Sequence, residues 1–183
     1  REAASADRIA VQFHGYAHTH LDFLAHHFLS GKMYNGFSRD EYVTMEGGAT
    51  RGSIHNVKDG IFTRGVLVDL PRLKGVPFLD PGTPVYVEDL ESWERSAGVR
   101  ISSGDAVFIR TGRWVRRARL GAWNVSQRAA GLDASVIPWL RRRDVAILGS
   151  ESALSVSPNP PTTQITNPDD YLPVHNFVLV ALG

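Results

Sequence analysis

The chain has 183 residues, which is enough for one domain of ordinary size with a sizeable core. Hydrophobic residues make up 43% of the sequence and charged residues 21%, a balance typical of a globular protein and not of a disordered or fibrous one. With 20 basic and 19 acidic side chains the net charge is +1, so nothing predicts binding to nucleic acid or to an anionic membrane.

The N-terminal residues predict a short strand and no targeting segment. The opening REAASADRIAV has no charged start followed by a long apolar core, so it does not read as a signal peptide. A strand is predicted at residues 10–13. No apolar run in the sequence reaches the roughly 18 to 20 residues that span a bilayer. We therefore expect a cytoplasmic protein without membrane contact.

Residues 14–27 read HGYAHTHLDFLAHH and contain five of the seven histidines of the chain. If residues 18–22 are extended, alternate side chains share one face. His18, His20 and Asp22 then point to the same side. A helix is predicted directly afterwards, at residues 23–29.

This stretch is a candidate metal site with a base beside it. Because the sequence contains no cysteine, a metal must be bound by histidine and carboxylate side chains. Two imidazoles and one carboxylate suit Zn(II), Mn(II) or Fe(II) and leave positions for water and substrate. His26 follows four residues after Asp22 and could move a proton at neutral pH. A polar run that binds nothing is the alternative, and His14, His27 and His55 are assigned flanking or loop roles.

The middle of the chain alternates β-like and helix-like runs, which predicts an α/β or α+β fold without an internal repeat. The helix at residues 87–97 begins with acidic residues and is followed by Gly98, where a C-cap glycine belongs. The arginine-rich residues 114–123 invite a nucleic-acid interpretation, but the near-neutral net charge favours a solvated helix face. Strands are predicted at residues 65–70, 105–110 and 145–148, and helices at residues 87–97 and 135–142.

The C-terminal part combines a polar loop with an apolar end. Residues 157–173 are rich in Pro, Asn and Thr and predict a surface loop or lid. An apolar strand is predicted at residues 174–182, and His175 at its mouth is either a satisfied core histidine or a residue that faces the site. The sequence begins without methionine and ends on this apolar segment, whereas chain ends normally lie at the surface. We expect residues 1–183 to form a single domain and to be a fragment of a longer polypeptide.

The histidine stretch resembles the signature of the metal-dependent cyclase family, which includes bacterial kynurenine formamidase and isatin hydrolase. The family pattern is H-x-G-T-H-x-D-x-x-x-H, and four residues match it: Thr19, His20, Asp22 and His26. The resemblance implies an α/β fold with a central β-barrel-like mixed sheet flanked by helices. Similarity outside the signature covers most of the chain, at residues 31–36, 65–75, 104–114, 144–151 and 173–183.

The sequence departs from the family pattern at two places. Tyr16 stands where the pattern has its first histidine, and His18 stands where it has glycine. Because a phenol is a poorer ligand than an imidazole near neutral pH, the similarity to an HTHLD subfamily implies that His18 takes over as ligand. His175 matches a late histidine that, with a following glutamate, completes a second metal position in formamidase-like members. The chain stops before any such acid, so the number of ions stays open.

The resemblance also implies the chemistry and its residues. In the family, metal-activated water attacks the carbonyl of an amide, cyclic imide or lactone, and His26 matches the general acid/base. Glu151 falls where relatives carry an acid and could orient a ligand or water. The implied partners are a small-molecule substrate and further copies in a homo-oligomer. The implied cofactor is a divalent metal, Mn or Zn, with four ligands: His18, His20, Asp22 and His175.

Substrate contacts and the reaction itself stay open at this point. Tyr16, Phe23 and Tyr34 are candidates for substrate binding, and Phe28 and Phe37 for the surrounding wall, with core packing as the alternative. Besides the hydrolase, a lyase or isomerase that stabilises an enolate with the same metal fits the residues. A non-catalytic metal- or ligand-binding module is the third possibility, favoured if the exchange at Tyr16 and the short C-terminus disable the chemistry.

Overall fold

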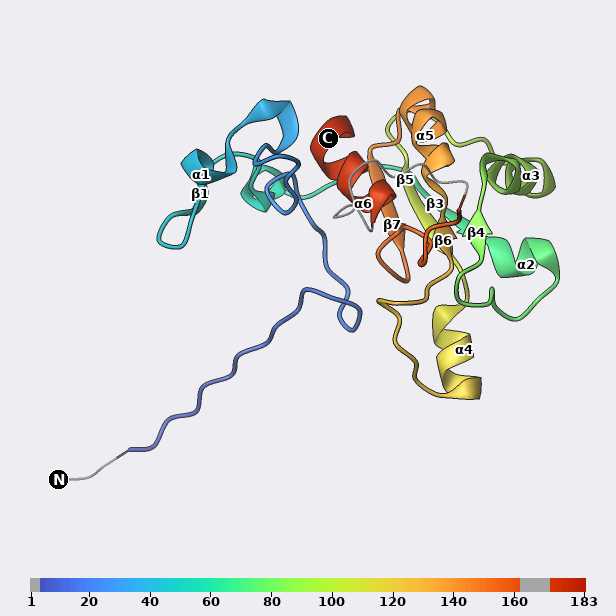
Figure 1. The fold of residues 1–183 in the computed structure, drawn as a ribbon, viewed down its shortest axis with the longest axis horizontal. Coiled ribbons are helices and arrows are strands. Elements are labelled where there is room, and N and C mark those ends of the chain that lie inside the picture. The colour runs from blue at the N-terminus through green and yellow to red at the C-terminus, as the bar shows by residue number, and fades with distance from the viewer. Residues whose placement is uncertain (1–3, 162–171) are drawn as a thin grey trace.

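The structure is a computed structural model, and it describes residues 4–161 and 172–183 (Figure 1). Its centre is a three-stranded parallel sheet in the order β3-β5-β7. The prediction of an α/β fold is confirmed, and the sheets of the described residues do not close into a barrel. The strands are β3 (Gly65–Asp69), β5 (Ala106–Arg110), β7 (Ile147–Ser150), the antiparallel pair β1 (Val43–Thr44) and β2 (Gly48–Ala49), and the parallel pair β4 (Pro84–Val85) and β6 (Gly131–Leu132).

Short helices connect these strands. The helix predicted at residues 87–97 is confirmed with the same bounds, and Gly98 follows it in the left-handed region with φ 64°. None of the helices within residues 4–161 and 172–183 is long and apolar enough to cross a membrane. The helices are η1 (Tyr34–Gly36), α1 (Arg39–Tyr42), η2 (Ile54–Val57), α2 (Leu70–Lys74), α3 (Val87–Ala97), α4 (Arg113–Leu120), η3 (Ala134–Val136), α5 (Ile137–Arg143), α6 (Pro173–Phe177) and η4 (Val178–Leu182).

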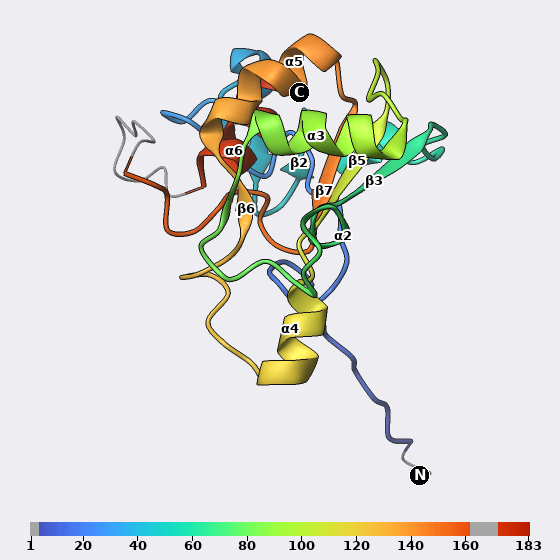
Figure 2. The ribbon, with the colours of Figure 1, turned by 90° about the vertical axis from the view of Figure 1, so that its right-hand side faces the viewer.

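The hydrophobic core lies on one face of the parallel sheet. Alternation along β3 and β5 turns Leu67 and Phe108 to the opposite, exposed face. Figure 2 shows α3 and α5 beside the sheet, and Figure 1 shows α6 and the N-terminal segment on its other side. Both faces of a parallel sheet are normally covered, so the second face is where a site can form. The core side chains include Val66, Val68, Val107 and Ile109 from the sheet, Leu90 from α3, and Trp139 and Leu140 from α5.

The two elements predicted at residues 10–13 and 23–29 are wrong. Residues 10–13 have no regular secondary structure, and Figure 1 shows the chain leading away from the body there. Residues 23–29 form one turn instead of a helix, because their backbone N–H groups bond elsewhere. His26 N donates to the carbonyl of Phe23 at 2.8 Å, but Ala25 N donates to Gly52 at 3.0 Å and Leu29 N to Lys32 at 2.8 Å.

The strand predicted at residues 174–182 is also wrong, since α6 and η4 occupy this segment. A short apolar run does not distinguish a strand from a buried helix by periodicity. Pro173 at the start of α6 is the signal that favours a helix, and Val174 N is bound by the Ser155 hydroxyl at 3.1 Å.

The remaining predicted elements are present. The strands expected at residues 65–70 and 105–110 correspond to β3 and β5, and the helix at residues 135–142 to η3 and α5. The strand expected at residues 145–148 is shifted by two residues to β7. Most of the predicted loop at residues 157–173 lies outside the described residues, since residues 162–171 are not described.

An ion pair between Arg64 and Asp105 connects the residue before β3 to the residue before β5. Arg64 Nε donates to Asp105 Oδ1 at 2.8 Å, and Ser102 N donates to Asp105 Oδ2 at 2.8 Å. The hydrogen bond from Arg64, helped by the one from Ser102, holds the pKa of the Asp105 carboxyl below its ordinary value of 3.8.

We expect Asp105→Asn to lower the melting temperature at neutral pH and to weaken the acid sensitivity of the protein. Because the folded-state pKa lies below the unfolded one, the stabilisation is complete above pH 3.8 and is lost as the pH falls through the folded value. Thermal unfolding followed by circular dichroism between pH 7 and pH 2 measures this, with Asp59→Asn at an exposed position as control. Parallel curves for the wild type and Asp105→Asn would contradict the assignment.

Candidate metal centre

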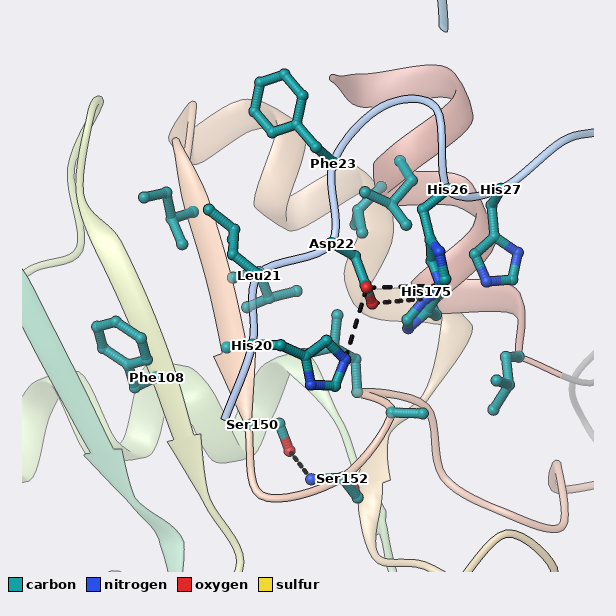
Figure 3. Close-up of a pocket in the computed structure, with 18 of the residues that line it drawn as sticks. His20, Leu21, Asp22, Phe23, His26, His27, Phe108, Ser150, Ser152 and His175 are labelled. Atoms are coloured by element: carbon teal, nitrogen blue, oxygen red, sulfur yellow. Dashed lines mark hydrogen bonds and ion pairs between the residues drawn. The ribbon is translucent and has the colours of Figure 1, made fainter. Parts of the chain in front are cut away.

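A cavity of about 550 Å³ lies between the open face of the sheet, the histidine stretch and the C-terminal helices. Figure 3 shows residues of this cavity, with Phe108 on one side and the histidines on the other. Most of residues 14–27 line it, so the stretch singled out in the sequence faces a space large enough for a small molecule. Its apolar wall includes Leu21, Phe23, Phe108, Leu148 and Leu179.

The chain conformation around Asp22 explains how its neighbours converge. Residues 19–23 have no regular secondary structure. In Figure 3, His20 and Asp22 point to one side and Leu21 to the other, as expected for an extended segment. The turn from Phe23 to His26 then brings the last histidine back toward Asp22.

Asp22 is the centre of the cluster. Its Oδ1 lies 3.2 Å from His14 Nδ1, 3.6 Å from His20 Nε2 and 3.5 Å from His26 Nε2. Its Oδ2 lies 3.5 Å from Nε2 of His175, which comes from α6 at the other end of the chain. Four imidazoles therefore surround one carboxylate that is only 15% exposed.

The arrangement suits a bound cation better than a hydrogen-bond network. Asp22 Oδ1 and His175 Nε2 are buried and have no hydrogen-bond partner among the described residues. Leaving such atoms unsatisfied costs roughly 1–3 kcal/mol each. Two ligands bound to one ion at about 2.1 Å in tetrahedral geometry lie about 3.4 Å apart, which is close to the measured separations from Asp22. The donor set of the cluster thus fits Zn or Mn.

Among residues 4–161 and 172–183, two groups of three side chains have ligating atoms within 4.8 Å of one another. One consists of His14, Asp22 and His26, and the other of His26, His27 and His175. His14 and His27 were assigned flanking roles from the sequence, yet both lie in the cluster. The high density of histidines was the only signal for them, because their positions depend on how an irregular loop folds back.

Burial favours the neutral form of His26 and His175 at pH 7. Desolvation, with the neighbouring His27, lowers the pKa of His175 to about 4, although Asp22 acts in the opposite direction. Desolvation also lowers the pKa of His26, against the attraction of Asp22. Neutral imidazoles have a lone pair available for a metal or for a proton.

The tautomer of His20 is fixed by the backbone. The Nδ1–H of His20 donates to the carbonyl of His18 at 2.8 Å, which leaves the Nε2 lone pair directed toward Asp22. A second bond of this kind is the usual way in which a protein orients a metal-binding histidine. His18 thus supports His20 through its carbonyl. Neither the exposed side chain of His18 nor the ring of His20 belongs to the two groups found among the described residues.

Of the other predicted site residues, Tyr16 and Phe23 line the cavity and Tyr34 does not. The ring of Tyr16 lies 5.7 Å from the Arg113 guanidinium. Tyr34 lies in η1, where its ring contacts Gly183 beyond η4. The roles given to these residues, and to His18, His20, Asp22, His26 and His175, stay predictions.

Glu151, which was expected to orient a ligand or water, caps a helix. Its Oε2 accepts hydrogen bonds from the backbone N–H groups of Thr111 and Gly112 at 2.7 Å each and from that of Arg113 at 3.2 Å. These donors lie at the N-terminus of α4, where a carboxylate compensates unpaired N–H groups and the helix dipole.

Comparisons with known proteins give a matching family model and related solved structures. Residues 5–155 match the family model named Cyclase, described as "Putative cyclase". No curated protein matches the chain. A crystal structure described as a novel cyclase is 28% identical with a TM-score of 0.70, over 87% of this chain and 50% of that one.

Two isatin hydrolases are more distant. One, bound to the product analogue thioisatinate, is 20% identical with a TM-score of 0.50, over 86% of this chain and 53% of that one. Isatin hydrolase A from Ralstonia solanacearum is 21% identical with a TM-score of 0.45, over 63% and 42%. The chain therefore spans about half the length of the solved structures that it matches.

Proposed function

The chain belongs to the cyclase family, and from that premise we propose that it is a metal-dependent hydrolase that opens an amide, cyclic imide or lactone of a small molecule. The observation that carries this proposal is a largely buried carboxylate, Asp22, surrounded by four imidazoles in the wall of a cavity. The fold shared with an isatin hydrolase supports hydrolysis as the reaction class.

In this proposal His20, Asp22 and His175 hold a divalent metal, Mn or Zn, and His18 remains a predicted further ligand. Such an ion lowers the pKa of a bound water to about 7 and polarises a carbonyl oxygen. The hydrogen bond from His20 to the His18 carbonyl keeps the imidazole in the orientation that binding requires.

His26 is the proposed proton carrier. Its ring is neutral at pH 7 because burial lowers its pKa, so Nε2 can accept a proton from the attacking water. The protonated ring then donates to the leaving nitrogen or oxygen. The stacking of His26 on His14, with 4.7 Å between ring centroids, holds the ring in place.

The apolar wall selects a small molecule with a planar or aliphatic body. Phe23 and Phe108 face the cavity from the histidine stretch and from β5, and an apolar surface of this kind excludes water from the reacting carbonyl. Assembly into a homo-oligomer is a further part of the proposal, which size-exclusion chromatography with light scattering tests.

We expect chelation to abolish turnover and added Mn or Zn to restore it. The experiment screens arylformamides, cyclic imides and lactones with the metal-loaded protein, then with protein stripped by a chelator and shown by circular dichroism to be folded. Incorporation of labelled oxygen from solvent water into the product identifies hydrolysis, as opposed to lyase or isomerase chemistry. Undiminished turnover by the metal-free protein would overturn the proposed function.

A further inference from the structure

The cavity contains a second polar feature apart from the histidine cluster. Two arginines line it, Arg113 at the start of α4 and Arg141 near the end of α5. Arg141 faces Asp144 at 3.7 Å. Arg113, by contrast, forms no ion pair with any carboxylate in residues 4–161 and 172–183, although part of its side chain is buried.

Among the described residues, two other partly buried arginines have a carboxylate partner, and a third, Arg116, instead packs its guanidinium 4.3 Å from the Trp123 ring centroid. Arg110 lies 2.7 Å from Asp69, and Arg143 lies 2.7 Å from Glu94. Removing a guanidinium from water is costly unless an opposite charge compensates it. Of the two arginines that line the cavity, Arg113 is therefore the one without a carboxylate oxygen within ion-pair distance in the described residues, although the charge of Glu151 acts on it from further away.

The carboxylate of Glu151 attracts the Arg113 guanidinium electrostatically, but its hydrogen bonds go to other groups. Its Oε2 accepts three backbone N–H groups at the start of α4, and the contact with the Arg113 guanidinium runs through the Glu151 main-chain carbonyl. Burial lowers the pKa of the Arg113 guanidinium, but an arginine side chain stays charged at neutral pH.

The Arg113 guanidinium is fixed in position by two aromatic rings. It lies 5.7 Å from the ring centroid of Tyr16 and 4.5 Å from that of Trp114. Such contacts orient a guanidinium without neutralising it. Tyr16 is two residues before His18, so the group lies beside the segment that carries the histidine cluster.

We propose that Arg113 binds a carboxylate of the molecule that occupies this cavity. The proposal rests on the proposed function for its ligand class, because hydrolysis of an amide, imide or lactone produces a carboxylate. The same contact serves a substrate that already carries an anionic group. A planar, preorganised guanidinium is the side chain best suited to a carboxylate.

Isothermal titration with benzoate and its neutral analogue benzamide tests the contact on the metal-loaded protein. We expect Arg113→Met to weaken benzoate binding by about 10- to 100-fold, the range for a hydrogen bond to a charged group, and to leave benzamide binding unchanged. Arg113→Lys keeps the charge and retains part of the affinity. Arg119→Met, at an exposed position of the same helix, serves as the matched control, and thermal unfolding shows that each variant is folded.

Binding needs no turnover, so this result is independent of whether the protein hydrolyses anything. Equal benzoate affinity in the wild type and Arg113→Met overturns the proposal. The proposal is also overturned if benzoate binding depends on the metal alone, so that chelation abolishes it in both proteins.

Kinetics with phthalimide and 4-carboxyphthalimide separate the two sources of the carboxylate. If Arg113 binds a group on the substrate, Arg113→Met lowers kcat/KM for the carboxylated imide alone. If it binds the product, both kcat/KM values stay unchanged and inhibition by phthalamate weakens. If none of these quantities changes in Arg113→Met, the proposal is contradicted.

Discussion

Asp22→Asn is expected to abolish stoichiometric metal binding and to lower kcat/KM by ~10³-fold or more, since a metal supplies several kcal/mol of transition-state stabilisation and each 1.36 kcal/mol is a factor of ten. The physical reason is the position of this carboxylate. Both of its oxygens lie 3.2–3.6 Å from imidazole nitrogens, and no other carboxylate of the described residues lies within ion-pair distance of those four rings.

The measurement is metal content by mass spectrometry of the purified variant, together with initial rates. Asn keeps the shape of the side chain but lacks the negative charge, so the change isolates electrostatics from packing. Asp40→Asn is the control, because Asp40 is 77% exposed and forms its ion pair with the neighbouring Arg39. If Asp22→Asn retained a full equivalent of metal, the carboxylate would not be a ligand.

His26→Gln is expected to lower kcat by ~10²- to 10⁴-fold, the usual contribution of a positioned acid or base, while the protein keeps its metal. Glutamine retains a hydrogen-bonding group but cannot carry the proton. His55→Gln is the control, since His55 lies exposed in η2 and does not line the cavity of the histidine cluster.

Metal content decides how this result is interpreted. His26 belongs to both groups of ligating atoms, so a loss of metal parallel to the loss of rate would make it a ligand and not the proton carrier. Retained metal with unchanged kcat would remove it from the chemistry altogether.

Apolar runs and helix-capping residues were the signals from which part of the fold could be predicted. The helix at residues 87–97 has acidic residues in its first turn and Gly98 after its end, and it was found with the same bounds. The parallel strands β3 and β5 are continuous apolar runs of the kind that buried strands require. The strand predicted at residues 174–182 was wrong because a mainly apolar run of nine residues suits a helix as well as a strand.

Several residues of the site could be predicted from the sequence, but their arrangement in space could not. Spacing and family resemblance pointed to His20, Asp22 and His26, which lie together. The sequence could not show that Tyr16 would contact Arg113, or that the exposed imidazole of His18 would contribute through its backbone carbonyl. These outcomes depend on how an irregular loop turns, which side-chain patterns do not encode.

The contact between Asp22 and His175 joins opposite ends of the described chain. Two such distant positions come together only after the sheet and the C-terminal helices have formed, so an ion that needs both has no comparable site in the unfolded chain. Occupancy then raises the free energy of unfolding in proportion to the logarithm of metal concentration above the dissociation constant. The supply of metal in the cell would in this way govern how long the protein survives proteolysis, and not only how fast it works.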